Sequence, residues 1–190
     1  KLFFSLKKKK IKSLLTREPG GTKSAELIRN LILKDYFNKS RKEKFDKYTD
    51  TLLYLAARNE HVKTKILPAL KKKKVVICDR FVDSTIAYQV YGKKINFKFI
   101  NDIHKIILGK IKPNLTFILK VSQKSAKERL KKRRSKNRYD NFSQLFYDKA
   151  QKSFLKISKN KKNYIVLDSS KNDDFLEKEI FKITLKYLKM

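Results

Sequence analysis

The chain has 190 residues, 41% of them hydrophobic and 12% aromatic, which is typical of one globular domain rather than of a disordered segment. One cysteine excludes an internal disulfide, and no apolar run approaches the roughly 18 residues of a membrane-spanning helix. The formal net charge of +32 raises the question of an anionic partner such as nucleic acid. We therefore expect a single cytoplasmic domain, residues 1–190, with no membrane partner.

Short apolar runs rich in β-branched residues alternate along the chain with segments of helical periodicity. The runs are typical of buried parallel strands, and the alternation predicts an α/β domain whose parallel sheet is flanked by helices. Two lysine runs, 7–10 and 71–74, each follow a helix and precede a strand, where cations suit the helix dipole. In chain order we expect a strand at 13–16, a helix at 27–32, a helix at 52–66 stopped by Pro68, a strand at 75–78, a helix at 100–107, strands at 115–119 and 164–167, and a helix at 175–185.

Charged segments follow three of the four expected strands, and the first of them contains two glycines. In parallel α/β sheets the ligand lies at the carboxyl ends of the strands, so these segments are the candidates for chemistry. Asp79 and Arg80 leave the second strand together, which suits a phosphate site, although a structural ion pair at the strand end is the alternative reading. The segments are Thr-Arg-Glu-Pro-Gly-Gly-Thr at 16–22, Asp-Arg-Phe-Val-Asp-Ser at 79–84 and Asp-Ser-Ser at 168–170.

Several segments together resemble the motifs of bacterial thymidylate kinases. Residues 16–22 resemble the loop after that family's second strand, and residues 78–89 resemble its signature around the third strand. Residues 53–58, Leu-Tyr-Leu-Ala-Ala-Arg, resemble the helix that contacts thymine. The match continues in order at 113–117, 128–129 and 137–140. The resemblance implies a P-loop nucleoside-monophosphate-kinase-like fold, phosphoryl transfer from ATP to dTMP giving dTDP and ADP, Mg²⁺ as cofactor, and a homodimer.

The resemblance also assigns a phosphate end to the substrate site. It implies that Arg80 grips the acceptor phosphate and acts in catalysis, and that Asp79 holds Mg²⁺ through water. Arg29 would be a second clamp on the dTMP phosphate, whereas an isolated helix Arg would more often be a surface residue. Glu18 and Pro19 would shape the pocket wall, and the two glycines that follow would let the backbone approach the nucleotide closely.

The base end of the site falls on two helical segments. Tyr54 and Arg58 are four residues apart and share a helical face. By resemblance Tyr54 stacks on thymine, while Arg58 bonds the carbonyl edge that distinguishes thymine from cytosine. Ser84 and Gln89 would contact the base, and Tyr88 would crowd the ribose 2′ position and so select deoxyribose. The glycine that usually follows this glutamine arrives two residues late here.

A basic stretch at about 131–141 corresponds to the family's mobile lid over ATP. An arginine in such a lid can reach the transferring phosphoryl group, as an arginine finger does. A solvated basic loop is the alternative. The candidate catalytic residues of the lid are Arg133, Arg134 and Arg138, and the sequence does not single out one of them.

The two histidines belong to no motif. His61 and His104 fall in expected helical segments, and neither has an acidic or cysteine partner at the spacing of a metal site. We interpret both as ordinary helix residues.

The phosphate-loop motif of this fold, G-x-x-x-x-G-K-[S/T], does not occur in the sequence. The four glycines lie at 20, 21, 92 and 109, and none makes that pattern. We therefore expect that roughly 20 residues, the first, central strand and the phosphate loop, are missing. The strands at 75–78 and 115–119 would then lie in separate groups or close irregularly. The chain alone would be inactive.

Two other functions stay open at this point. A deoxynucleoside kinase shares the acid–Arg strand end, although the Arg-Glu-Pro-Gly-Gly loop at 17–21 argues against it. A small basic nucleic-acid-binding protein would account for the charge. Of the 50 basic residues, however, 41 are lysines spread along the whole chain, as A/T-rich coding of a solvated surface would produce. We therefore do not expect nucleic acid as a partner.

Overall fold

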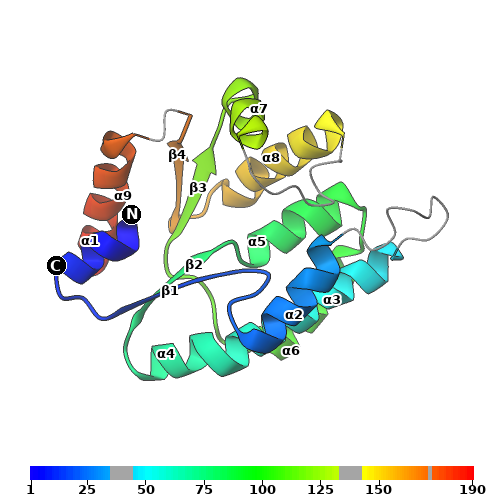
Figure 1. Cartoon of the computed structure of the whole chain (residues 1–190), viewed down its shortest axis with the longest axis horizontal. Helices are drawn as coiled ribbons and strands as arrows, with labels where there is room; N and C mark the ends of the chain where they lie inside the picture. Colours follow the sequence, from blue (N-terminus) through cyan, green and yellow to red (C-terminus); the bar gives the residue numbers. More distant parts are fainter. Residues whose placement is uncertain (35–44, 133–142, 171–172) are drawn as a thin grey trace.

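The computed structural model describes residues 1–34, 45–132, 143–170 and 173–190 (Figure 1). Within these ranges four strands form two separate two-stranded parallel sheets. Each strand lies where the sequence predicts it, and the separation of the two sheets confirms the expectation of two strand groups. The pairs are β1 (Ser13–Arg17) with β2 (Val75–Asp79), and β3 (Thr116–Lys120) with β4 (Tyr164–Asp168).

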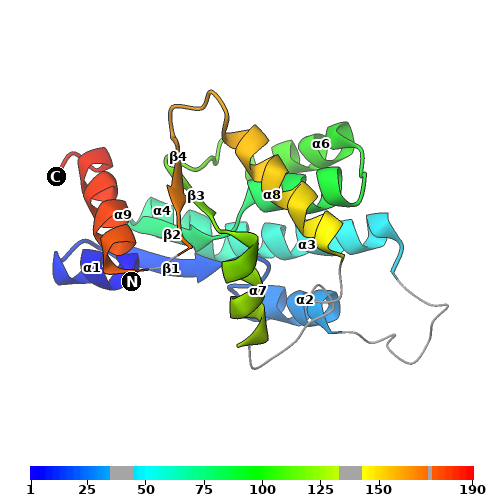
Figure 2. The ribbon, with the colours of Figure 1, turned by 90° about the horizontal axis from the view of Figure 1, so that it is seen from above.

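Helices surround the sheets on both sides, which confirms the predicted α/β class. α1 and α9 pack together on one flank, and α2, α3, α4 and α6 gather on the other (Figures 1 and 2). The α-helices are α1 (Leu2–Lys8), α2 (Lys23–Leu33), α3 (Lys47–His61), α4 (Leu67–Lys71), α5 (Val82–Thr85), α6 (Phe97–Leu108), α7 (Gln123–Lys131), α8 (Gln144–Ser158) and α9 (Asp174–Tyr187); two π-helical segments are η1 (Val62–Ile66) and η2 (Ile86–Gly92). None of these helices has the length and apolarity to cross a lipid bilayer.

Local sequence signals explain where these helices begin and end. Five helices start at a side chain that accepts a hydrogen bond from a backbone N–H of the first turn. Lys7 and Lys8 lie in the last turn of α1, and Lys71 lies in the last turn of α4, as expected for cations near a helix C-terminus. The five capping residues are Thr22, Asp46, Asn96, Ser143 and Asp173.

The prediction that Pro68 stops the long helix is wrong. The helical path continues from α3 through η1 into α4, and Pro68 lies in the first turn of α4. A proline is tolerated there because the first N–H groups of a helical turn need no intrahelical acceptor.

The hydrophobic core brings α3 and α6 together, and this packing positions the site. Leu55 of α3, Ile95, and Ile100 and Ile107 of α6 form one buried cluster. Arg58 follows Leu55 by one helical turn. His104 lies between the two isoleucines of α6. Burial of the apolar residues therefore draws the two polar side chains inward with them.

A polar contact joins the two halves of the molecule. The hydroxyl of Tyr164, at the start of β4, donates to both carboxylate oxygens of Asp83 on α5, at 3.1 and 3.0 Å. Burial, and then the neighbouring carboxylate, raise the pKa of Tyr164 to about 12, so this side chain remains a donor. A second group of contacts is aromatic. The ring centroid of Tyr88 in η2 lies 5.9 Å from that of Phe146 and 6.0 Å from that of Phe154, both in α8.

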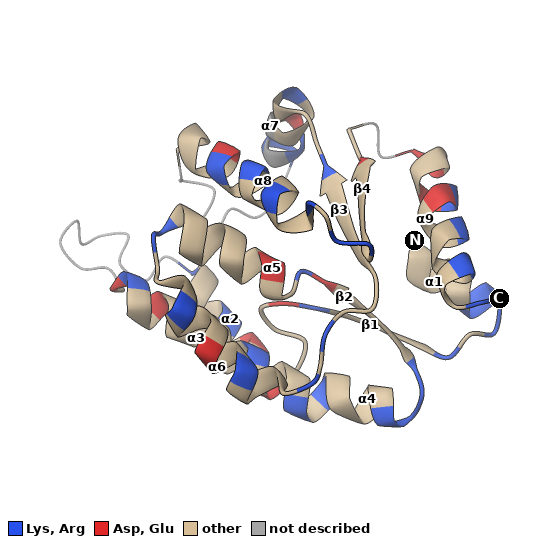
Figure 3. Cartoon of the chain, turned by 180° about the vertical axis from the view of Figure 1, so that it is seen from behind, with Lys and Arg blue, Asp and Glu red and all other residues tan. Residues whose placement is uncertain are grey.

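The basic residues are distributed over many elements. Figure 3 shows Lys and Arg on α1, α4, α8 and α9 alike, rather than along one helix or sheet edge. This distribution agrees with a generally solvated basic surface and does not favour a nucleic-acid groove.

Candidate active site

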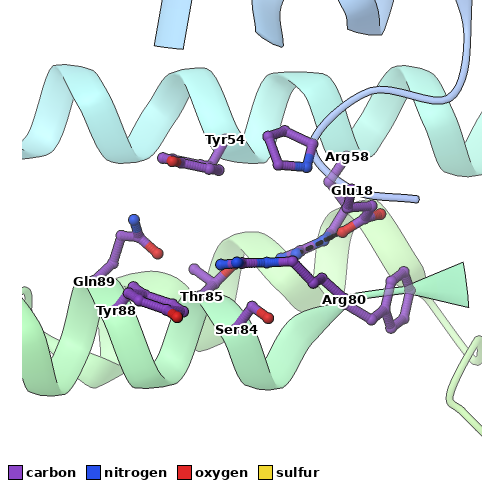
Figure 4. Close-up of a pocket in the computed structure, with 10 residues that line it drawn as sticks. Glu18, Tyr54, Arg58, Arg80, Ser84, Thr85, Tyr88 and Gln89 are labelled. Carbon is purple, nitrogen blue, oxygen red and sulfur yellow. Dashed lines mark hydrogen bonds and ion pairs between the residues drawn. The ribbon is translucent and has the colours of Figure 1, made fainter. Parts of the chain in front are cut away.

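A pocket opens at the carboxyl ends of β1 and β2 (Figure 4). Its walls come from the loop after β1, from α3, from the loop after β2, and from α5 and η2. The loops leave the sheet side by side because Arg17 of β1 pairs in register with Asp79 of β2. The ten lining residues are Glu18, Pro19, Tyr54, Arg58, Arg80, Phe81, Ser84, Thr85, Tyr88 and Gln89.

An unusual backbone conformation directs Arg80 toward the pocket. Its φ is +66°, in the left-handed region, which costs a non-glycine residue roughly 1–2 kcal/mol. Its guanidinium carbon lies 4.7 Å from the centroid of the Tyr88 ring. Such outliers cluster at functional sites, where the surrounding structure holds the strained residue.

Two aromatic rings border the pocket from opposite helices. In Figure 4, Tyr54 points in from α3, whereas Ser84 and Tyr88 lie on the other side, on α5 and η2. Gln89 of η2 is 2% exposed. Gln89 lies within a π-helical segment that ends at Gly92, the next glycine in the chain.

The guanidinium of Arg58 is held by three buried side chains from three other elements. Nε donates to Glu18 Oε2 at 2.7 Å, and Nη2 lies 2.6 Å from the same oxygen. Nη1 donates to Thr85 Oγ1 at 2.8 Å and lies 2.6 Å from His104 Nε2. Arg58 is 3% exposed, so this charge is desolvated and depends on its partners.

Glu18 is held in turn by a second histidine. His61 Nδ1 lies 3.1 Å from Glu18 Oε1, and His61 Nε2 lies 2.6 Å from Thr16 Oγ1. Gly21 must be a glycine at this point. Its φ is +94°, and an added Cβ would lie 2.6 Å from His61 Nε2.

The ionisation states of this network follow from burial and charge. Burial alone would raise the pKa of Glu18, but the charge of Arg58 and the hydrogen bond from His61 outweigh it and lower the pKa. Burial, and then the charge of Arg58, lower the pKa of His104 to about 3. At neutral pH the network therefore contains an ionised Glu18, a charged Arg58 and a neutral His104.

Comparisons with known proteins agree with this geometry. The family model described as thymidylate kinase matches residues 1–180. The chain belongs to the thymidylate kinase family. Thymidylate kinases of the Wolbachia of Brugia malayi and of Mycoplasma capricolum are 46% and 40% identical over 148 and 181 residues. Those alignments cover 77% and 94% of this chain, and 66% and 83% of the two relatives. The crystal structure of the Ehrlichia chaffeensis thymidylate kinase superposes with a TM-score of 0.71 at 29% identity, over 96% of this chain and 87% of that one.

The structure brings together most of the residues that the family motifs suggested. Eight of the nine expected substrate-binding residues line the pocket, and Arg29 is the ninth. Arg29 lies just outside, where its Nη1 donates to the carbonyl of Pro19 at 2.7 Å. Burial, and then the positive charge of Arg17, lower the pKa of Arg29, and Arg80 adds to the same effect. Arg29 thus lies beside Pro19 without forming the pocket wall.

Asp79 is the carboxylate that the family motifs assign to Mg²⁺. Asp79 is exposed at the end of β2. In the described ranges no group of three or more His, Cys, Asp or Glu side chains could hold a metal ion. A single exposed carboxylate fits a cation that arrives with nucleotide phosphates and keeps its waters, rather than a site built from protein ligands alone.

The lid prediction lies outside the described residues. α7 ends at Lys131, and Arg133, Arg134 and Arg138 fall in the range 133–142. Their roles stay predictions.

Sequence reasoning missed four residues of the site and its support. Phe81 and Thr85 line the pocket. The interpretation of His61 and His104 as ordinary helix residues is wrong, since both bind site side chains. His61 could have been found, because it is three residues from Arg58 on one helical face. His104 carries no local signal, because it is 46 residues away from its partner.

Proposed function

We propose that the pocket after β1 and β2 is the dTMP-acceptor site through which this family transfers a phosphoryl group from ATP, giving dTDP and ADP. The observation that carries the proposal is the arrangement of Arg58 and Arg80. One guanidinium is buried and fixed from several sides, and the other reaches in from the mouth of the sheet. A buried hydrogen-bond donor suits the base of a nucleoside monophosphate, and a cation that enters from the strand ends suits its phosphate.

The base would lie between the helices. Tyr54 offers a ring face from α3. The Tyr88 ring, on the other side, lies against the Arg80 guanidinium. Arg58 can only donate hydrogen bonds, so it suits the carbonyl edge of thymine or uracil and opposes the exocyclic amine of cytosine. Tyr88 would also crowd a ribose 2′-hydroxyl and favour deoxyribose.

The phosphate would lie at the mouth of the sheet. Arg80 would bind it directly, with Arg29 beside it as a second positive charge. Asp79 would hold Mg²⁺ through water, and Mg²⁺ would supply charge neutralisation between the nucleotide phosphates when bound. The lid arginines would complete the positive charge around the transferred group.

Binding of three nucleotides to the 190-residue chain tests this function. We expect isothermal titration calorimetry to show dTMP binding more tightly than dUMP, and far more tightly than dCMP. Because the sequence contains no phosphate-loop motif, we expect turnover in a coupled ADP-release assay with ATP and Mg²⁺ only from a longer chain that has one, in the same order of nucleotides. Equal binding or comparable turnover of dCMP would contradict the assignment.

The homodimer also stays a prediction. Leu27 and Leu31 of α2 and Leu52 of α3 are 69%, 42% and 47% exposed, and these neighbouring helices could form an interface. Size-exclusion chromatography with light scattering would measure the oligomeric state. A monomer at all concentrations would contradict the prediction.

A further inference from the structure

His104 touches the base end of the site from behind. It lies on α6, is 7% exposed, and is not among the lining residues of the pocket. Within the part of the chain that the structure describes, its one side-chain hydrogen bond joins Nε2 to Nη1 of Arg58, at 2.6 Å. A histidine in this position acts on a ligand only through the arginine.

The chemistry of the pair determines the state of the imidazole. A guanidinium has five N–H donors and no acceptor, so Nε2 of His104 must accept and cannot carry a proton. The proton of the neutral ring is then on Nδ1. The nearby positive charge and the burial of the ring both disfavour a second proton.

The partners of Arg58 account for most of its donors. Nε donates to Glu18, Nη1 donates to Thr85 and to His104, and Nη2 forms an ion pair with Glu18. The hydrogen bonds of Nε and Nη1 therefore use three of the five N–H groups. The remaining N–H groups are on Nη2, and they are the candidates for the ligand contact.

We propose that His104 is a positioning residue for base selection: its neutral imidazole fixes the Arg58 guanidinium so that one N–H faces the pyrimidine carbonyl edge. The inference rests on the proposed dTMP site, and it identifies His104 as the residue that makes Arg58 selective for the base. Without an acceptor at Nε2, the Nη1 group would lose one of its two restraints. The guanidinium could then turn, binding a carbonyl less well and opposing an amine less strongly.

Two substitutions separate the hydrogen bond from the bulk of the side chain. His104→Leu removes the Nε2 hydrogen-bond acceptor and fills the same space in the core with an apolar side chain. His104→Gln places an amide oxygen near the position of Nε2 and should restore the acceptor. Calorimetric titration of the wild-type chain and both variants with dTMP and dCMP gives the affinities, and circular dichroism with thermal unfolding checks the fold.

We expect His104→Leu to bind dTMP about tenfold more weakly, as for loss of an ordered bond to a charged donor. Its affinity for dCMP should stay the same or rise, so the preference for dTMP falls at least about tenfold. His104→Gln should recover most of that preference. If the role of His104 were merely structural, His104→Leu would weaken the binding of dTMP and dCMP alike and leave the preference for dTMP unchanged.

The outcomes are distinguishable. A wild-type chain that does not prefer dTMP contradicts the proposed function itself. A wild-type preference that survives intact in His104→Leu overturns only the role of His104. If His104→Leu does not fold, Thr85→Val removes the other Nη1 acceptor at constant side-chain shape. An unchanged preference in that variant would equally overturn the positioning argument.

Discussion

Lowering the pH from 7 to 5 is expected to destabilise this protein through one side chain, His104. Its pKa falls from an ordinary 6.5 to about 3 in the folded chain, through burial and then the charge of Arg58. Below pH 6.5 the unfolded chain therefore binds a proton that the folded chain does not, and the free energy of unfolding decreases as the pH falls toward 3. At pH 5 the linkage amounts to about 2 kcal/mol, since the unfolded imidazole is almost fully protonated there and the folded one is not.

The matched control is His104→Gln, which keeps an acceptor for Arg58 but does not titrate. Urea unfolding followed by far-ultraviolet circular dichroism at pH 5, 6 and 7 gives the free energy of unfolding of both proteins. We expect the wild type to lose about 2 kcal/mol more than the variant between pH 7 and pH 5. All other titratable groups are common to both chains and cancel in the difference. Parallel pH dependences would mean that folded His104 takes up the proton, which would refute its assignment as a neutral acceptor.

Three further substitutions test the site and its support. Arg80→Ala should weaken dTMP binding by about 2–3 kcal/mol in calorimetry, because a charge-assisted phosphate contact is lost. Arg80→Lys should recover part of that affinity. An unchanged affinity in Arg80→Ala would mean that this arginine is structural only. Gly21→Ala should lower the free energy of unfolding by more than Gly109→Ala, because an added Cβ meets His61 at 2.6 Å in the first case and nothing within 4 Å in the second; equal losses would exclude the steric argument. Tyr164→Phe removes a hydrogen bond to a carboxylate between the two halves and should cost about 1–3 kcal/mol in urea unfolding, whereas no loss would show that this contact is not stabilising.

Local sequence patterns were sufficient for the four strands, for several of the helices and for most of the pocket wall. The four strands are short β-branched runs, and parallel pairing places whatever follows β1 and β2 at the same edge. Glu18 and Arg80 could therefore be expected side by side from sequence alone. Tyr54 and Arg58 could be assigned to one face because helical periodicity is local. The likeness to the thymidylate kinase motifs added the roles, and the family itself is confirmed.

Tertiary packing alone decided how these residues are held. Pro68 did not end its helix, because the preceding π-helical segment placed it in a first turn where its missing N–H is tolerated. His104 reaches Arg58 only because apolar residues on α3 and α6 pack into one core. A hydrogen bond between residues 46 positions apart leaves no periodic trace in either helix. Sequence spacing reports which residues share a face, whereas the partner of each face depends on how the buried surfaces fit together.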